Sequence, residues 1–245
     1  MKNLKTFLVL ILVIILGSVC FSSVGCKVGN ASSNSSSGVS SKSSIKNLAN
    51  EISISQNAKE IFKYATDKGI TGLTSYGETL STLYIPPSIN GIDTTFISAN
   101  AFANKTMTTV YILPGITSIH DSAFLHCTNL KNVYIADTVT NLGANAFDTC
   151  SMLEEIVLSK NIDRINKQTF FACSKLKEIV IPKKVKMLDS KNFVGCKNLE
   201  KVIFEKTTGW KAYKGYYTAE VDMSDAEAIA GFLKGYYSEW YWRNM

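Results

Sequence analysis

The sequence has few histidines and lacks the motifs of common enzyme active sites. Only two histidines, His120 and His126, occur among its 245 residues. No nucleophile stands beside a base at a suggestive spacing, no glycine-rich phosphate loop is present, and no pair of carboxylates is set apart from the pattern described below. These absences argue against nucleophilic catalysis, phosphoryl transfer and acid–base hydrolysis. We therefore expect no catalytic residues, no cofactor and no enzyme activity.

The N-terminal hydrophobic run is shorter than a membrane span. Phe7 to Leu16 is an uninterrupted apolar run of ten residues, whereas a spanning helix needs about 20. Lys2 and Lys5 precede it, and a positive start followed by a short apolar run is typical of a secretory signal peptide. We assign residues 1–26 to this signal.

The signal peptide ends in Ser23-Val24-Gly25-Cys26, small residues before a cysteine. This ending resembles the lipobox of bacterial lipoproteins and implies that Cys26 becomes the lipidated N-terminus of the mature chain. Lipid chains on Cys26 would tether the exported protein to a membrane. Ordinary secretion with a nearby cut, or an uncleaved anchor, are the alternatives.

Net positive charge is scarce in the body of the chain. The formal net charge is +6, but residues 1–50 alone carry five lysines and no acidic residue. The remainder is nearly neutral and offers no basic footprint of the size that phosphate binding requires. We expect no nucleic-acid partner.

Residues 27–50 lack the apolar side chains that build a core. Nine of the fourteen residues in 31–44 are serine. A serine-rich segment of some twenty residues behaves as a flexible tether with a reach of roughly 25 Å. We interpret it as a linker that holds the following domain away from the membrane.

Beyond residue 80 the chain repeats with a step of 23 residues. Cys127-Thr-Asn-Leu130-Lys-Asn-Val133-Tyr-Ile135 recurs from Cys150, from Cys173 and from Cys196, and a phenylalanine precedes each cysteine by three residues. Alternate residues of Leu-x-x-Val-x-Ile point inward along a short strand. One repeat cannot bury this apolar set alone, whereas stacked repeats bury it between them. The spacing predicts a solenoid over 80–205 with a parallel sheet on one side.

Both ends of the predicted solenoid are expected to be capped. Short β-type runs over 51–85 predict strands that cover the first repeat. At the other end, 206–245, Ser224 to Glu227 resembles a capping box before a short amphipathic helix. The many aromatic residues there either seal the open end or, through residues such as Trp240 and Trp242, offer a platform for sugars.

The pattern Leu-x-x-Val-x-Ile-Pro…Ile-x-x-x-Ala-Phe-x-x-Cys resembles the BspA-like, or Treponema-type, leucine-rich repeats of bacterial surface proteins. The resemblance covers about residues 61–205 and is best at Ala123 to Cys127 and Ala146 to Cys150. It implies a leucine-rich-repeat solenoid of the β-rich α/β horseshoe type. It also implies an extracellular binding or adhesion surface without catalysis.

The four repeat cysteines raise the question of a metal site or disulfides. Equivalent positions in neighbouring repeats lie ~4.8 Å apart with parallel side chains. Four cysteines then form a line roughly 14 Å long, which cannot close into a tetrahedral site. We expect small buried thiols and no metal.

The histidines also have structural interpretations. His120 aligns with Ser98, Gly143, Asn166 and Asp189, residue types that tolerate a positive φ, which predicts a turn residue. His126 is expected on a surface loop.

The outward column of the predicted sheet is the main candidate for a binding surface. It contains three tyrosines followed by three aliphatic residues: Tyr84, Tyr111, Tyr134, Val157, Val180 and Ile203. Rigid aromatic residues are good anchors for a partner, although such residues also simply favour strands.

A second candidate is a basic patch formed by Lys183, Lys184 and Lys186 in one loop. Residues 160–201 hold eleven basic residues against four acidic ones, while 82–155 hold two lysines against six acids. A basic half could engage an anionic glycan or headgroups. Solvated loops are the alternative interpretation.

These observations predict an exported, lipid-anchored, monomeric protein of the cell envelope or cell surface. Its repeat surface would bind an extracellular protein or glycoprotein. An envelope structural or carbohydrate-binding protein is the alternative, with a glycan as ligand.

The lipid anchor can be tested by palmitate labelling. Labelled palmitate should enter the wild-type chain and be lost in Cys26→Ala, because the cysteine thiol is the acceptor. Cys20→Ala is the matched control and should keep its label. Cys20 follows Val19 and not a small residue such as Gly25, so we expect it to be a poor lipid acceptor. Equal label in wild type and Cys26→Ala would exclude this anchor.

Overall fold

The structure is a computed structural model that describes residues 58–220 and 222–244. The signal peptide, Cys26 and the serine-rich linker 27–50 lie outside the described residues, as do residues 51–57 of the expected N-terminal cap. Within 58–220 and 222–244, no helix has the length and apolar character that a membrane crossing requires.

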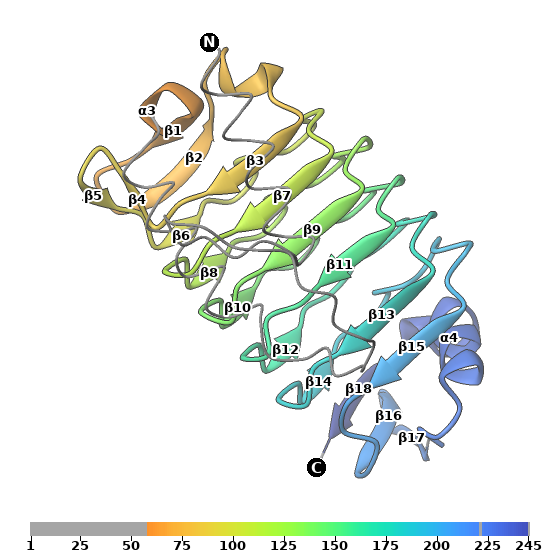
Figure 1. Cartoon of the computed structure of the whole chain (residues 1–245). Coiled ribbons are helices and arrows are strands. Elements are labelled where there is room, and N and C mark those ends of the chain that lie inside the picture. The colour runs from red at the N-terminus through yellow and green to blue at the C-terminus, as the bar shows by residue number, and fades with distance from the viewer. Residues whose placement is uncertain (1–57, 221, 245) are drawn as a thin grey trace, which may run out of the picture.

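The repeats coil into a solenoid with two walls (Figure 1). The wall of longer strands, here the long wall, consists of β3 (Thr82–Ile85), β7 (Thr109–Ile112), β9 (Asn132–Ile135), β11 (Glu155–Val157), β13 (Glu178–Ile181) and β15 (Lys201–Phe204). The opposite or short wall consists of β6 (Phe96–Ile97), β8 (Ser118–Ile119), β10 (Asn141–Leu142), β12 (Arg164–Ile165) and β14 (Met187–Leu188). Pairing is parallel, and Val133 lies opposite Ile156, one 23-residue coil later. The predicted solenoid of 23-residue repeats is confirmed.

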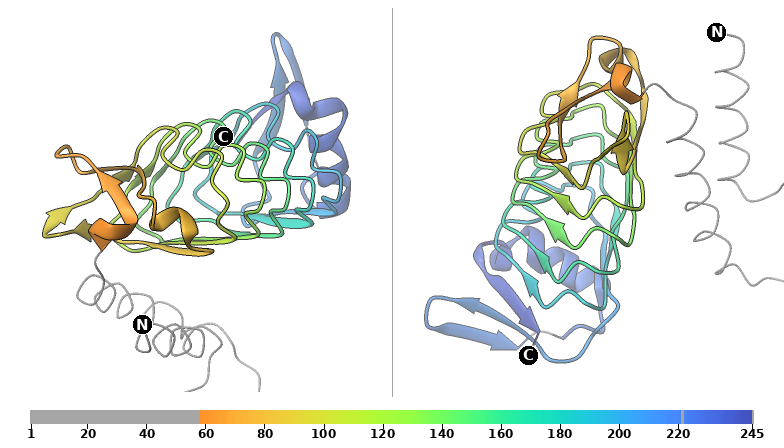
Figure 2. Two further views of the ribbon diagram at one scale, coloured as in Figure 1. Left: turned by 90° about the horizontal axis from the view of Figure 1, so that it is seen from above. Right: turned by 90° about the vertical axis from the view of Figure 1, so that its left-hand side faces the viewer.

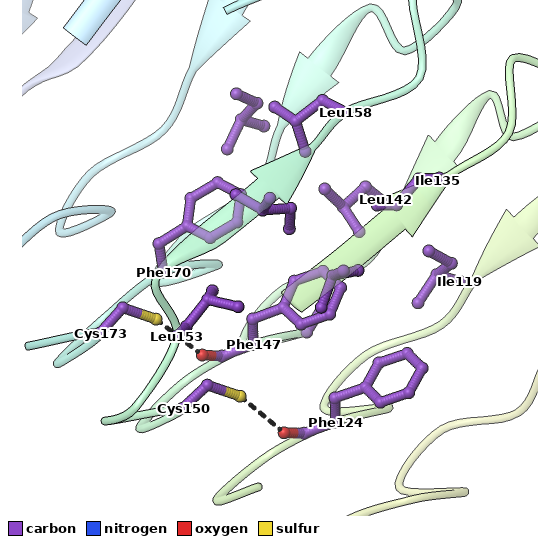
Figure 3. Packing of buried hydrophobic residues seen from close by; sticks show 14 of the residues in the cluster. Ile119, Phe124, Ile135, Leu142, Phe147, Cys150, Leu153, Leu158, Phe170 and Cys173 are labelled. Atoms are coloured by element: carbon purple, nitrogen blue, oxygen red, sulfur yellow. Dashed lines mark hydrogen bonds between the residues drawn. The ribbon is translucent and has the colours of Figure 1, made fainter. Parts of the chain in front are cut away.

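A stack of phenylalanines fills the space between the walls (Figure 3). Successive rings from Phe102 to Phe193 lie 5.1 to 6.0 Å apart between centroids. Each cysteine thiol donates a hydrogen bond to the phenylalanine carbonyl of the preceding coil. Cys150 Sγ lies 3.2 Å from Phe124 O, and Cys173 Sγ 3.2 Å from Phe147 O. The expected buried thiols are confirmed, and burial raises the pKa of the Cys150 thiol well above its usual value.

The turns beyond the short wall hold non-glycine residues in the left-handed region. Two positions in each turn lie in this region. Asn145, with φ of 54°, occupies the first position, and His126, with φ of 57°, occupies the second, which lies four residues after the first. The prediction of a positive φ for His120 is therefore wrong, since the turn begins two residues later. His120 instead stacks on Phe96, with 4.7 Å between ring centroids.

The hydrogen-bond ladder is interrupted once on each wall. Among the described strands, β11 does not pair with β13, nor β10 with β12. We call this interruption the ladder gap. After β7, β9 and β15 the next residue donates its backbone N–H to the preceding coil, as Ala136 does to Ile112 at 3.1 Å. Pro182 occupies this position beside the gap and has no N–H to donate.

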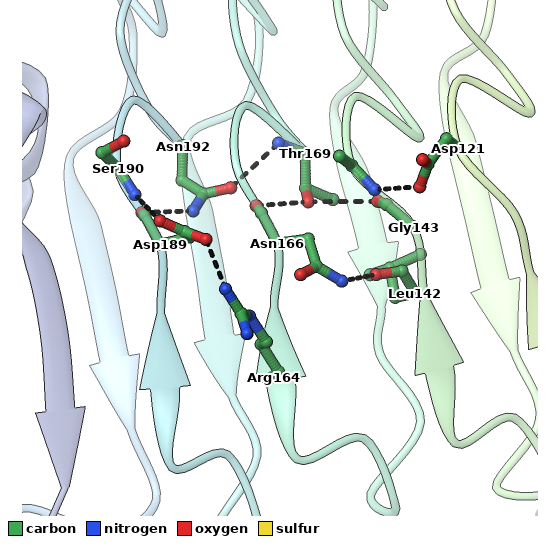
Figure 4. Close-up of polar contacts among 10 residues, drawn as sticks. Asp121, Leu142, Gly143, Arg164, Asn166, Thr169, Asp189, Ser190 and Asn192 are labelled. Atoms are coloured by element: carbon green, nitrogen blue, oxygen red, sulfur yellow. Dashed lines mark hydrogen bonds and ion pairs between the residues drawn. The ribbon is translucent and has the colours of Figure 1, made fainter.

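Side chains bridge the ladder gap (Figure 4). Asn166 Nδ2 donates to Leu142 O at 2.6 Å, and Asn161 Nδ2 donates to Asp137 O at 2.6 Å. Ser159 Oγ donates to Val139 O, also at 2.6 Å. The Asn166 bond spans the unpaired strands β10 and β12, while the Asn161 and Ser159 bonds join the loops that lead there from the paired strands β9 and β11.

The N-terminal end begins with short elements that lead into both walls. They are α3 (Ala58–Ile61), β1 (Phe62–Tyr64), β2 (Gly69–Leu73) and the 3-10 helix η1 (Gly77–Thr79). β2 pairs with β6 in parallel and so starts the short wall. The longer first coil contains a small hairpin of β4 (Ser88–Ile89) and β5 (Ile92–Asp93), which turns at Asn90 and Gly91.

The C-terminal end closes the solenoid with a sheet and a helix (Figure 2). Its elements are β16 (Trp210–Lys214), β17 (Tyr217–Glu220), α4 (Ala226–Lys234), η2 (Tyr236–Glu239) and β18 (Tyr241–Asn244). β18 pairs antiparallel with β14 and extends the short wall, while α4 packs beside β15, where Lys234 Nζ reaches Leu199 O at 2.5 Å. The β16–β17 hairpin projects from this end of the solenoid.

The C-terminal end differs from the sequence-based expectations in two places. Trp240 and Trp242 are buried, with exposed fractions of 8% and 0%, so they seal the end and cannot serve as a sugar platform. The N-cap of α4 is Asp225 rather than Ser224, because the Asp225 carboxylate accepts from the backbone N–H of Glu227 and Ala228.

The phenylalanine stack should dominate stability. Phe147→Ala removes a fully buried ring between two neighbours and is expected to cost about 3–5 kcal/mol. Val157→Ala, at an exposed position, should change stability by less than about 0.5 kcal/mol. Urea unfolding measures both, and equal midpoints for the two variants would contradict this account.

Candidate binding surface

The outer face of the long wall carries a continuous apolar stripe. Strand alternation sends the second and fourth residues of each strand inward, so the third faces out. Tyr84 pairs with Tyr111, and Tyr111 with Tyr134, in register. The outer stripe comprises Tyr84, Tyr111, Tyr134, Val157, Val180 and Ile203.

The three tyrosines stack on one another. Ring centroids of Tyr84 and Tyr111 lie 4.8 Å apart with 5° between planes, and those of Tyr111 and Tyr134 lie 4.8 Å apart with 10°. Tyr111 therefore has both faces covered by neighbouring rings. The Tyr134 hydroxyl donates to Glu155 Oε2 at 3.0 Å. A ligand at this half of the stripe would meet ring edges and hydroxyl groups.

The stacked phenols resist ionisation. Burial, with a smaller contribution from neighbouring Tyr111, raises the pKa of Tyr84 to about 12. Burial and the Glu155 carboxylate raise the pKa of Tyr111 and of Tyr134 as well. The tyrosine half of the stripe is therefore uncharged at neutral pH and can act only as a hydrogen-bonding and apolar surface.

The aliphatic half of the stripe is open to solvent. Val157, Val180 and Ile203 are 46%, 41% and 36% exposed. Exposed glutamates, Glu155 and Glu178, lie two residues before the valines on β11 and β13 and are here called the acidic row.

A second charged row borders the opposite side of the valines. Exposed lysines, Lys160 and Lys183, stand three residues after Val157 and Val180, just beyond the strands. We call them the lysine row. The sequence analysis missed both rows, although the 23-residue alignment of Glu155 with Glu178 and of Lys160 with Lys183 would have revealed them.

The predicted basic patch is exposed but partly engaged. Lys183, Lys184 and Lys186 lie in the loop between β13 and β14 and are all exposed. Lys184 Nζ donates to Asn161 Oδ1 at 2.7 Å, so its ammonium is already bound within the protein. The C-terminal strand adds a neighbour, since Asn244 N donates to Lys186 O at 2.9 Å.

The remaining titratable residues do not assemble a chemical site in the part of the chain that the structure describes. Within it, no three His, Cys, Asp or Glu side chains cluster as metal ligands. The repeat thiols are each bound to a carbonyl, His120 stacks on Phe96, and His126 lies in a turn.

The tyrosine stack predicts a late phenol titration. Tyr84 keeps its proton up to about pH 12 in the folded chain but ionises near 10 when unfolded. The folded state thus holds more protons, and the stabilisation from Tyr84 is complete below about pH 10 and is lost as pH rises towards 12. Tyrosinate absorbance should show a component near pH 12 that Tyr84→Phe removes. Superimposable titrations of both proteins would contradict the burial of this phenol.

Known structures share this architecture. The leucine-rich repeat protein TpLRR of T. pallidum superposes with a TM-score of 0.53 at 22% identity, over 74% of this chain and 96% of that one. A leucine-rich repeat protein from Eubacterium ventriosum ATCC 27560 gives 0.50 at 18% identity, over 60% of this chain and 40% of that one. A leucine rich cell surface protein from Faecalibacterium prausnitzii A2-165 gives 0.39 at 23% identity, over 50% and 41%. The chain thus spans less than half the length of the last two.

Sequence comparison agrees with the fold. No curated protein matches the chain. The family model described as "BspA type Leucine rich repeat region" matches residues 95–215 in six copies. This range contains the phenylalanine stack from Phe102 to Phe193 and all four buried cysteines. The chain, through its repeats, therefore belongs to the BspA-type leucine-rich repeat family.

Proposed function

We propose that this chain is an exported, lipid-anchored protein of the cell surface that binds another protein through the outer stripe of its long wall. The observation that carries the proposal is that all six strands of the long wall, on both sides of the ladder gap, place an apolar residue at the same outward position, with Val157, Val180 and Ile203 left exposed. Contiguous exposed apolar residues on a soluble domain mark contact surfaces. A leucine-rich repeat solenoid supports protein interaction in general, and adhesion is the more specific role we assign.

Strand propensity alone does not account for the stripe. β-branched residues favour strands at any position, yet the same strands carry Glu155, Glu178 and Lys201 at their other outward position. Polar residues are therefore compatible with this face. The stripe remains apolar through six consecutive coils, which favours a requirement for contact.

The tyrosine geometry favours a protein ligand over a sugar at the stripe. Sugar rings stack on exposed aromatic faces, but the faces of Tyr111 are covered by Tyr84 and Tyr134. Edges and hydroxyls of tyrosine suit the mixed apolar and polar contacts of protein interfaces.

The anchor and the domain organisation complete the proposal. Residues 1–26 direct export, lipid on Cys26 holds the mature chain at the membrane, and residues 27–50 act as the tether. The caps, 51–85 and 206–245, enclose the repeats of 80–205 so that a monomer displays the long wall. The short apolar run Phe7 to Leu16 before Cys26 supports this arrangement.

Carbohydrate binding is a second candidate function, favoured by one observation. Tyr216 and Tyr217 at the tip of the β16–β17 hairpin are 105% and 73% exposed, and Lys214 lies beside them. Exposed aromatic rings of this kind, together with the basic loop Lys183 to Lys186, could hold an anionic glycan. The ligand would then meet the C-terminal end and not the long wall.

A single binding screen separates the two functions. The chain from residue 27 onward is tested against matrix proteins and glycans, beside Tyr111→Ser with Tyr134→Ser and, as the matched control, Tyr216→Ser with Tyr217→Ser. We expect the stripe variant to lose protein binding by about tenfold or more, while the hairpin variant keeps it. Circular dichroism confirms that each variant is folded. Glycan binding lost only in the hairpin variant would favour the second function, and unchanged binding in both variants would contradict both assignments.

A further inference from the structure

We infer that the partner presents to the outer stripe an amphipathic α-helix that lies along the solenoid axis, with basic residues on one flank and acidic residues on the other. The inference rests on the proposed function, because it specifies what the same stripe receives. It follows from the hydrogen bonding, the spacing and the charges of the long wall.

The outer face of the long wall offers side chains, and only at the ladder gap do neighbouring strands, β11 and β13, leave their facing backbone groups unpaired with each other. Backbone groups of its strands point within the sheet towards neighbouring strands, as in the paired registers of β3 with β7 and β7 with β9. An extended peptide lying on the outer face would find no backbone partners and would leave its own N–H and C=O groups against apolar residues. A helix satisfies its backbone internally and exposes only side chains.

The spacing of the stripe suits a helix. Neighbouring strands place one stripe residue every ~4.8 Å, and an α-helix presents one turn of its apolar face every ~5.4 Å. Five strand-to-strand steps, from Tyr84 to Ile203, span roughly 24 Å. A helix of about 16 residues covers that length.

The flanking charges define the chemistry of the helix. Along the chain Glu155 and Glu178 precede the valines by two residues, and Lys160 and Lys183 follow them by three, where their backbone N–H groups donate to the carboxylates of Asp137 and Glu205. β11 ends at Val157 and Lys160 lies in the following turn, so Glu155 and Lys160 are closer than the roughly 17 Å of five extended residues, a limit within which a helix of ~10–12 Å diameter fits. Glu154 and Lys177 precede Glu155 and Glu178 by one residue. Their charges are opposite, so together they add no net charge beside the acidic row. Basic residues on one helix flank and acidic residues on the other would therefore be paired.

The size of the stripe argues against a second copy of this chain as the occupant. A surface roughly 24 Å long and one helix, about 10 Å, wide is far smaller than the ~800 Å² that each partner buries in a stable interface. One helical segment matches the available surface, whereas a whole domain would extend beyond it. The uncharged Thr82 and Thr109 stand two residues before Tyr84 and Tyr111, at the position that Glu155 and Glu178 occupy in their own strands. The acidic row is thus confined to β11 and β13, since β15 holds the exposed Lys201 at the equivalent position.

Designed peptides test the inference on the full mature chain. The first peptide, of about 16 residues, has a leucine face, lysines on one flank and glutamates on the other. Two relatives keep the leucine face but carry only glutamates or only lysines on both flanks, and a fourth has a central proline in the mixed sequence. Fluorescence anisotropy should show the mixed peptide binding about tenfold more tightly than the single-charge peptides, and the proline peptide should not bind.

Protein variants locate and reverse the preference. Val180→Lys should abolish binding of the mixed peptide, because it places a charge under the apolar face. Glu155→Lys with Glu178→Lys makes both flanks of the valines basic and should shift the preference to the all-glutamate peptide by about tenfold. Tyr216→Ser with Tyr217→Ser, on the distant hairpin, should leave every peptide affinity unchanged.

The outcomes are separable. Equal binding of the mixed and proline peptides, or a preference unchanged in Glu155→Lys with Glu178→Lys, would overturn the inference. So would the failure of all peptides to bind. If in those cases Tyr111→Ser with Tyr134→Ser still removes binding of a protein in the screen, the proposed function stands and the helix does not. If the peptide experiment fails and Tyr111→Ser with Tyr134→Ser also leaves protein binding unchanged, both the helix and the proposed function are overturned.

Discussion

The whole structure depends on burial shared between neighbouring coils. A 23-residue coil has too small an interior to bury its own apolar residues, so each coil packs its phenylalanine on the next. The cysteine thiol then adds a second hydrogen bond, from the next coil, to a phenylalanine carbonyl that already accepts a backbone N–H within its own coil. Both contacts require every coil to have nearly the same length and shape. This requirement explains why the inward positions vary little from coil to coil.

The same constraint leaves the outward positions free to carry function. The aliphatic residues that face solvent on the long wall contribute little to the packing between coils, whereas the tyrosines of the stripe stack between coils outside the core. The stripe is nevertheless apolar throughout, and its acidic and lysine rows occupy the two coils where the stripe residue is valine. The proposed binding surface thus takes its regular spacing from an interior that the ligand would not touch.

Sequence alone predicted those features that the repeat period determines. The period placed Val133 and Ile135 inside and Tyr134 outside, because alternation along a strand has only two faces. It could not place Trp240 and Trp242, which lie beyond the repeats and are buried through the pairing of β18 with β14. It misplaced the positive φ at His120 because residue types that tolerate such a φ also serve elsewhere. Pro182 was visible in the sequence, but its effect appears only once its missing N–H is set against the neighbouring coil.

Equivalent contacts between coils have a consequence for how such a chain changes over evolution. Where two coil boundaries are built from the same phenylalanine contact and thiol bond, removing or duplicating one whole coil rejoins surfaces that already fit. The ladder gap is the exception, since Asn161, Asn166 and Ser159 bridge it with side chains specific to that boundary. Recombination elsewhere preserves the fit, while an exchange at the gap must carry these three residues with it. The number of coils, and with it the length of the exposed stripe, is the most easily altered dimension of the molecule.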